Sequence, residues 1–224
     1  MKKNTLRIAA VAALAFVAAS AAQAQAGTIV GRIGATRIMP QVDSGSLSAP
    51  SFENSQIDIR ANTQLSGGLT YFVDDHLAID LPLALPFKHD VVGAGAVDGV
   101  GKVAEVKALP ITLLAQYHFL DPSQQIRPYL GGGLTYAKFF KERTTAALSA
   151  LTGGTPSNPT TMEVDPKLGV TVQVGTTVKI TDRISFDAAL LKTWLKTTAH
   201  LSTGQSIDFK INPYTVSLGV GYKF

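Results

Sequence analysis

The last twelve residues alternate between apolar and polar or small side chains. From residue 214 onward, every even position is apolar, and the odd positions carry Thr, Ser, Gly or Lys. A period of two predicts an extended strand with one apolar face. Tyr222 and Phe224 place two aromatic rings at the end of that face, where a membrane-spanning strand meets the lipid headgroups. The segment therefore predicts a transmembrane strand, although an edge strand of a soluble β-sandwich alternates in the same way.

Seven earlier segments show the same alternation, which predicts an all-β chain of eight strands. The predicted strands cover residues 28–38, 64–73, 77–87, 109–119, 127–143, 167–180, 183–190 and 206–224. The connections between them alternate between long and short, with long ones at 39–62, 91–104 and 144–161. This rhythm is typical of an antiparallel transmembrane β-barrel with short periplasmic turns and longer extracellular loops.

The polar faces of the predicted strands are rich in Gly, Ser and Thr and carry few charges. A barrel of eight strands leaves no open aqueous pore, so its inward residues must be small or must pair with one another. We therefore expect a polar plug in the periplasmic half of the lumen, formed by the charged residues on the inward face: Arg32, Asp80, Lys179 and Asp187.

The outer halves of the last two strands carry apolar residues on the face that is polar in the periplasmic halves of the same strands. These residues are Leu191, Leu195, Phe209 and Ile211. If the strands keep their register, this set lines a hydrophobic upper lumen that admits apolar solutes and excludes ions and sugars. A bulge at Pro213 would instead change the face, and strand ends that project beyond the membrane are a further alternative. The alternation alone leaves these alternatives open.

Aromatic residues on the outward face are expected at the membrane interfaces. The members of this set are Trp194, Tyr214, Tyr222 and Phe224. For Trp194, the single tryptophan of the chain, an inward ring that closes the lumen is the alternative.

The amino-terminal segment has the organisation of a secretory signal peptide. Lys2, Lys3 and Arg7 flank the start of an apolar run, and small residues provide an A-x-A cleavage site that ends at Ala24 or Ala26. The run is too short to cross a membrane as a helix. We expect residues 1–24 to be cleaved and residues 25–224 to form a single barrel domain.

The net charge of +4 does not indicate a nucleic-acid partner. Three of the 20 basic residues belong to the signal segment, which leaves 17 against 16 acidic residues and no basic patch. The chain has no cysteine, its four histidines lack metal-ligand spacing, and no serine lies in a nucleophile motif. We therefore predict no catalytic residue, no metal, no cofactor and no enzymatic activity.

Several segments together resemble the OmpW family of eight-stranded outer-membrane proteins over essentially the whole mature chain. They are Gly31-Arg32, Leu83 to His89, Leu109 to Phe119, Arg127 to Tyr136, Asn212-Pro213 and Gly219 to Phe224. The family includes alkane-import relatives, and the resemblance implies a narrow hydrophobic channel. Small apolar solutes would enter it from outside and leave sideways through the barrel wall.

The resemblance also bears on particular residues. The proline-kinked segment with Pro82 and Pro86 matches the region where the lateral opening is implied. The family narrows its lumen with a tryptophan on the seventh strand, but Leu191 best matches that position here, and Trp194 lies three residues further on. This departure puts a tryptophan gate in doubt.

We therefore predict a monomeric barrel of the Gram-negative outer membrane that takes up small hydrophobic molecules passively. The expected partners are outer-membrane lipid, small hydrophobic solutes and the barrel-assembly machinery. The C-terminal pattern of Ser217, Gly219, Tyr222 and Phe224 resembles the signal that this machinery recognises. The alternative is a non-transporting structural or surface-interaction barrel, whose loops contact phage, bacteriocin or host partners.

Overall fold

Eight long antiparallel strands form the wall of a closed barrel, which confirms the predicted fold. The computed structural model describes residues 26–224, so the predicted signal peptide at 1–24 lies outside the described residues. The barrel strands are β1 (Ile29–Met39), β4 (Asn62–Phe72), β5 (Leu77–Ala84), β7 (Lys102–His118), β8 (Ile126–Thr144), β10 (Lys167–Lys179), β11 (Ile184–Trp194) and β14 (Tyr214–Lys223).

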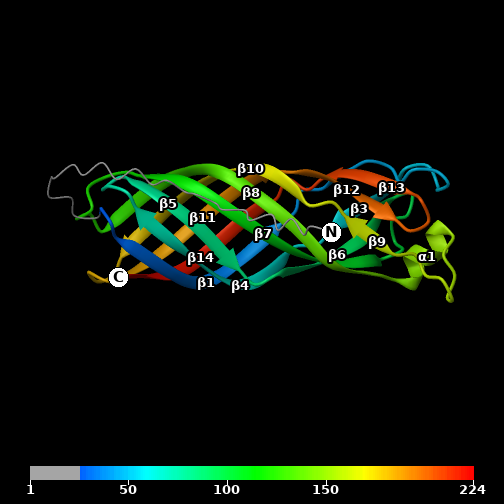
Figure 1. The fold of residues 1–224 in the computed structure, drawn as a ribbon, viewed down its shortest axis with the longest axis horizontal. Helices are drawn as coiled ribbons and strands as arrows, with labels where there is room; N and C mark the ends of the chain where they lie inside the picture. Colours follow the sequence, from blue (N-terminus) through cyan, green and yellow to red (C-terminus); the bar gives the residue numbers. More distant parts are fainter. Residues whose placement is uncertain (1–25) are drawn as a thin grey trace, which may run out of the picture.

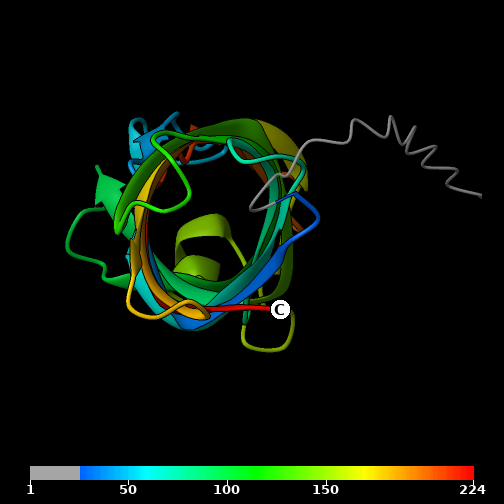
Figure 2. The same cartoon turned by 90° about the vertical axis from the view of Figure 1, so that its left-hand side faces the viewer.

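The barrel closes because its first and last strands pair with each other. Strand β1 pairs antiparallel with β14 from Val30 opposite Lys223 to Met39 opposite Tyr214. Around the ring, β1 is followed by β4, β5, β7, β8, β10, β11 and β14. Figure 2 shows the ring of strands in a view along the barrel. Each of the eight barrel strands therefore has a neighbouring barrel strand on both sides.

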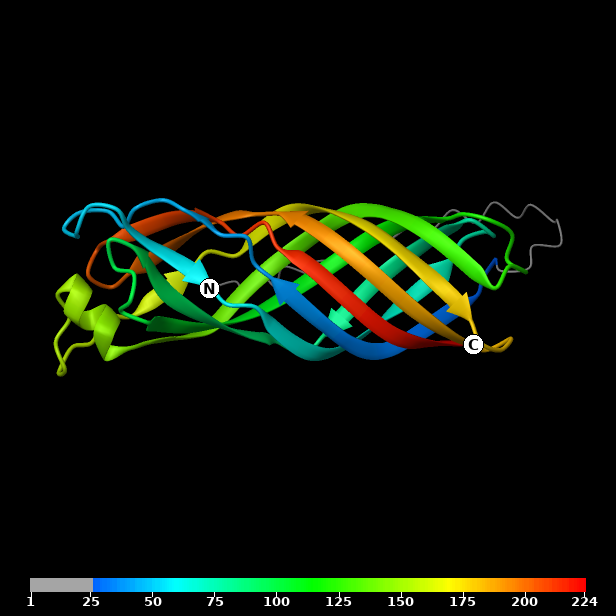
Figure 3. The same ribbon diagram turned by 180° about the vertical axis from the view of Figure 1, so that it is seen from behind.

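The barrel has two unlike ends, which we call the turn end and the loop end. The turn end carries the short connections, and the carboxyl terminus lies there (Figure 1). At the loop end, further short strands continue the wall, as Figure 3 shows from behind. They are β2 (Asp43–Ser44), β3 (Ser55–Ile59), β6 (Phe87–Gly95), β9 (Met162–Val164), β12 (Lys196–Leu201) and β13 (Ser206–Lys210).

These short strands correct the sequence prediction at two long connections. Residues 39–62, predicted as a loop, contain β2 and β3, and residues 91–104 contain the end of β6 and the beginning of β7. Strand β3 pairs with β6, and β13 pairs with both β12 and β2. The third long connection carries α1 (Ala146–Thr152), which begins after the N-cap Thr145 and ends at Gly153. The lumen wall therefore extends well beyond the predicted strand ends.

The outward face of the barrel strands is apolar on all sides, as a membrane-spanning barrel requires. Trp194 and Tyr214 point outward on neighbouring strands, and the Lys192 ammonium lies 3.9 Å from the centre of the Tyr214 ring. Tyr222 and Phe224 are exposed at the turn end, where their rings contact edge to face. Among residues 26–224, no helix is long and apolar enough to span a membrane.

The strands keep one face inward past Pro213 but change it at Pro86. Phe209 and Ile211 are buried before Pro213, and Thr215 follows on the same inward face. Leu83 in β5 and Leu85 just after it are exposed, whereas Phe87 in β6 has no exposed surface. In the single strand predicted at 77–87, an unbroken alternation would place Phe87 outward with Leu83. That expectation is wrong, because the break at residues 85–86 resets the alternation between β5 and β6.

Candidate functional site

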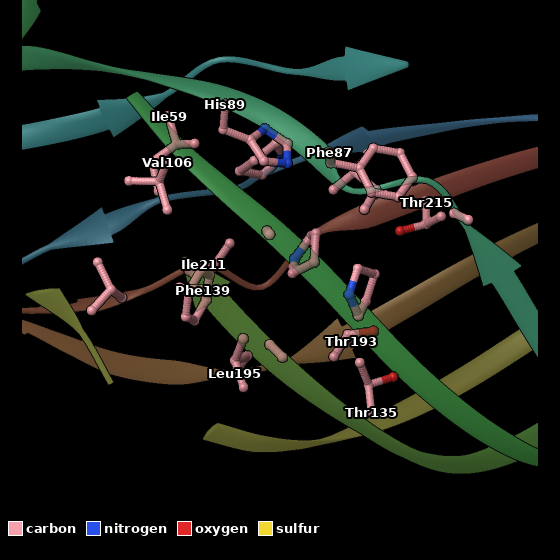
Figure 4. Close-up of a pocket in the computed structure, with 18 of the residues that line it drawn as sticks. Ile59, Phe87, His89, Val106, Thr135, Phe139, Thr193, Leu195, Ile211 and Thr215 are labelled. Atoms are coloured by element: carbon pink, nitrogen blue, oxygen red, sulfur yellow. The ribbon is translucent and has the colours of Figure 1, made fainter. Parts of the chain in front are cut away.

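A hydrophobic chamber occupies the loop-end half of the lumen (Figure 4). It encloses about 1220 Å³ of space between the protein atoms, including the part that is open to solvent. Apolar side chains from most of the strands line it, among them Ile38, Ile57, Ile59, Phe87, Val91, Val106, Ala137, Phe139, Val164, Ala199 and Phe209. The chamber is therefore built from both the barrel strands and the short strands that extend them.

The four residues predicted for a hydrophobic lumen all line this chamber. Leu191 lies on β11, Leu195 follows that strand, Phe209 lies on β13, and Ile211 precedes Pro213. Their exposed fractions are between 4% and 7%. They meet because odd positions face inward without interruption through β11, β12, β13 and β14.

The sequence prediction missed the chamber residues of β6 and the middle of β7. Phe87 and His89 lie on β6, opposite Ala108 and Val106 of β7, and all four line the chamber. The His89 Nδ1 atom lies 2.8 Å from the backbone oxygen of Arg60 and must donate to it, because a carbonyl only accepts. The spacing of Phe87, His89 and Val91 would have indicated an inward face, had the break at residues 85–86 been recognised.

A layer of Ser and Thr hydroxyls follows most of the lumen circumference at the turn-side end of the chamber. Figure 4 shows Thr135, Thr193 and Thr215 at one end of the chamber and Phe139 and Leu195 toward the other. We call this layer the hydroxyl belt. Its members are Thr36, Ser66, Thr112, Thr135, Thr171, Thr193, Thr215 and Ser217. The belt separates the apolar chamber from the polar interior below it.

Below the belt, an ion-pair cluster fills the lumen. The Arg32 Nη2 atom lies 2.6 Å from Asp80 Oδ1, and the Thr70 hydroxyl donates to the same oxygen at 2.7 Å. The Arg32 Nε atom lies 4.0 Å from Asp187, whose carboxylate accepts from the Tyr129 hydroxyl at 3.2 Å. We call these five residues the plug. Every charge in the plug has a partner of opposite charge, which is the condition for burying charges.

Lys179 does not join the plug, in contrast to the prediction that grouped it with Arg32, Asp80 and Asp187. Its ammonium lies 2.8 Å from Asp182 Oδ1, in the turn that follows β10. Lys179 instead lines a second, mixed-charge cavity of about 1140 Å³ between the plug and the turn end. It sits near the end of its strand, so the turn carboxylate is closer than the plug.

The chamber wall contains a stretch where two neighbouring strands do not pair. Strand β5 pairs with β7 from Leu77 opposite Tyr117 to Asp80 opposite Leu114, and pairing resumes only at Phe87 opposite Ala108. Among the described residues, none of 81–86 is paired with any of 109–113. We call this stretch the seam. On the edges that face away from the seam, pairing persists: β5 pairs with β4, and β7 pairs with β8.

Proline accounts for the seam. Pro82 and Pro86 lie on one side of it and Pro110 on the other. Because proline has no backbone N–H, each of the three removes a donor from the ladder. Pro82 and Pro110 also line the chamber, so the chamber reaches the seam, whereas Pro86 lies in the unpaired stretch without lining it. The structure thus brings the two predicted prolines to the seam, and Pro110 was not predicted.

The chamber is suited to holding uncharged molecules. None of the described residues that line it is Lys, Arg, Asp or Glu, and His89 is their single titratable side chain. Within residues 26–224, no group of three His, Cys, Asp or Glu side chains could hold a metal ion. The arrangement therefore favours binding through apolar contacts, with hydrogen bonds available only at the belt and at His89.

Comparison with known proteins gives consistent matches over most or all of the chain. The sequence profile of the OmpW family matches residues 25–224. Outer membrane protein W of Vibrio cholerae is 29% identical over 228 residues, covering 100% of both chains. Outer membrane protein AlkL of Ectopseudomonas oleovorans is 26% identical over 174 residues, covering 76% of this chain and 70% of that protein. The crystal structure of OprG from Pseudomonas aeruginosa superposes with a TM-score of 0.80 at 26% identity, covering 89% of this chain and 97% of that chain.

Proposed function

The chain belongs to the OmpW family, and we propose that it is a passive conduit through which small hydrophobic molecules enter the outer membrane. As an OmpW-family barrel it lies in the outer membrane of a Gram-negative cell. One copy encloses the whole chamber, so the proposed conduit is a monomer.

The observation that carries the proposal is the contact between the chamber and the seam. Leu83, Ala84 and Pro110 belong to the seam and line the chamber at the same time. An apolar solute in the chamber therefore lies beside the one stretch of wall between β5 and β7 that backbone hydrogen bonds do not hold together. Lipid lies on the other side of that wall, and Leu85 and Ile111 expose their side chains to it.

The plug gives the proposed path its direction. A solute that continued toward the turn end would have to displace the Arg32–Asp80 ion pair, which stabilises the closed lumen. Breaking a buried ion pair costs roughly 3–5 kcal/mol. Moving an apolar molecule sideways into lipid has no such cost, because the hydrocarbon region is as apolar as the chamber. No energy source is needed, since the solute moves down its own gradient.

Uptake of a labelled medium-chain alkane by cells with and without the protein tests this proposal. We expect faster uptake by the expressing cells and loss of that difference in Leu191→Asp and Phe209→Asp variants, because an unpaired carboxylate in the chamber is hostile to apolar solutes. The matched control is Ser185→Asp, which adds the same charge below the plug, in the turn-end cavity. This control should keep the uptake rate of the unmodified protein.

Equal uptake by expressing and empty cells would contradict the conduit. It would leave the alternative function, a surface-interaction barrel that contacts partners through its loop end. Equal loss in the Ser185→Asp control would instead indicate that any added carboxylate damages the barrel. Heat-modifiable migration on gels, a sign of a folded barrel, must therefore be measured for every variant.

A further inference from the structure

We propose that the hydroxyl belt binds the uncharged polar end of a small amphiphile, such as a medium-chain alcohol, while its chain lies in the apolar chamber. The inference rests on the proposed conduit and names its preferred substrate class. A chamber built only for alkanes would need no hydroxyls on its walls, because each one must be kept hydrogen-bonded.

The belt consists of two hydrogen-bonded groups and one further hydroxyl, that of Thr215. In the first, the Thr135 hydroxyl oxygen lies 2.8 Å from that of Thr112 and 2.6 Å from that of Thr171. Thr171 continues the chain to Thr193 at 2.9 Å. These four residues come from four consecutive strands of the ring: β7, β8, β10 and β11. The first group therefore follows half of the barrel circumference.

The second group covers most of the other half. The Thr36 hydroxyl lies 2.7 Å from the hydroxyls of both Ser66 and Ser217. These residues come from β1, β4 and β14. Only β5 contributes no hydroxyl at this level among the described strands, and there Pro82, opposite Gly68 of β4, takes the inward position. The belt is thus interrupted where the seam begins.

The belt has unused hydrogen-bonding capacity. A hydroxyl offers one donor and two acceptor positions. The Thr112–Thr135–Thr171–Thr193 chain uses three of its four donors and leaves several acceptor positions free. Thr215 adds a hydroxyl at the chamber wall that has no hydrogen-bond partner among the described residues. A ligand hydroxyl could both donate a hydrogen bond to this layer and accept one from it, whereas a ligand carbonyl could only accept one.

The electrostatics of the chamber select an uncharged polar end. The nearest cation on the turn side is Arg32 in the plug, which already serves Asp80 and Asp187. A carboxylate at the belt would therefore be buried without a counter-ion, at a cost of several kcal/mol. A hydroxyl keeps its hydrogen bonds at the belt, and its alkyl chain contacts Phe87, Leu195 and Ile211 higher in the chamber. The combination favours neutral amphiphiles over fatty acids.

The test compares uptake of 1-decanol, decane and decanoate by cells that express the protein, each relative to empty cells. In the double variant Thr135→Val/Thr215→Val, valine keeps the shape of threonine and removes the hydroxyl. We expect the ratio of decanol to decane uptake to fall about two- to tenfold, the effect of one lost hydrogen bond on an equilibrium constant. The matched control is Thr197→Val, which removes a buried hydroxyl that donates to the Asp165 backbone outside the chamber. Its ratio should equal that of the unmodified protein.

The outcomes separate this inference from the proposed function. Uptake of decanol and decane that depends on the protein, with a ratio unchanged in the double variant, would overturn the belt site and leave the conduit intact. Protein-dependent decanoate uptake at pH 8 as fast as that of decanol would overturn the preference for uncharged ends. No protein-dependent uptake of either neutral solute would overturn the conduit itself. If the double variant does not fold, the uptake ratio of the single variant Thr215→Val tests the belt site instead, because this substitution breaks no hydrogen bond within the described protein.

Discussion

Arg32 and Asp80 form an ion pair across the inside of the barrel, joining β1 to β5 although β4 lies between them. The Arg32 Nη2 atom lies 2.6 Å from Asp80 Oδ1, and the Asp80 carboxylate is fully buried. This pair is the centre of the plug. It holds three neighbouring strands together from the inside and closes the lumen below the chamber.

Replacing Arg32 with Ala should destabilise the barrel strongly. Asp80 would remain as a buried charge without its cation, which costs roughly 3–5 kcal/mol in the free energy of unfolding. Urea unfolding in lipid vesicles measures this loss. The matched control is Lys179→Ala, whose ion pair with the exposed Asp182 is screened by solvent and should contribute little. Removing both members of the Arg32–Asp80 pair in Arg32→Met/Asp80→Leu should recover only part of the stability, because Asp187 also loses its cation. Equal losses for Arg32→Ala and Lys179→Ala would contradict the role of the plug.

Gly175→Ala should destabilise the barrel because Tyr129 occupies the space that a Cβ would need. The added Cβ would overlap the ring and hydroxyl of Tyr129, which is 1% exposed and fixed by its contact with Asp187. Such overpacking costs about 1–3 kcal/mol. Gly132→Ala is the control, because a Cβ there meets no atom within 4 Å. A loss of stability of the same size at both positions would show that the cost is not steric.

Restoring the missing backbone donors at the seam should slow solute release. In Pro82→Ala/Pro110→Ala, both strands regain an N–H, so the ladder between β5 and β7 can extend. We expect slower alkane uptake and slower hydrogen exchange of amides in residues 109–113. Pro128→Ala on β8 removes an outward proline away from the seam and should change neither quantity. Faster uptake in the double variant would argue against exit through the seam.

Glu105 should remain ionised well below the pH at which a glutamate ordinarily takes up its proton. It lies at the loop end beyond the apolar band, where hydrogen bonds from Lys102 at 2.8 Å and Lys88 at 2.9 Å lower its pKa from 4.5 to about 2. The depressed pKa means that the ionised Glu105 stabilises the loop-end part of the wall above pH 4.5. This contribution is lost as the pH falls toward 2. Titration of the Glu105 carboxyl carbon by NMR should show a midpoint near the lower value. A midpoint near 4.5 would mean that the two lysines do not hold it in solution.

The alternation of residues was sufficient to predict the barrel, but it left an apolar lumen as one of several alternatives. Inward and outward faces have opposite chemical requirements, so a period of two survives in every long strand. Leu191 and Phe209 both face the chamber because the register continues past Pro213, which the alternation alone could not decide. It failed at Phe87 and His89, because the break at Pro86 resets the alternation.

The seam and the belt could not be predicted from single strands. The seam depends on the alignment of Pro82 with residues near Pro110 on another strand, and the belt depends on hydroxyls that meet only when seven strands are in register. Lys179 illustrates the same limit, since its face was foreseen but the proximity of Asp182 was not. The register between strands is set by the closed ring of strands, so the sequence of one segment does not determine it.

The pairing of β1 with β14 has a consequence for how the chain must assemble. Val30 and Lys223 are neighbours in the finished wall although almost the whole chain separates them. Hairpins such as β10–β11 can form from nearby residues, but the last closing step must bring the two ends of the sequence together, which is entropically the most demanding contact. Until then, β1 and the most recent strand both offer unpaired edges. Local folding of a nascent chain cannot pair these edges. Before insertion, its protection from aggregation through them therefore depends on completing the final strand.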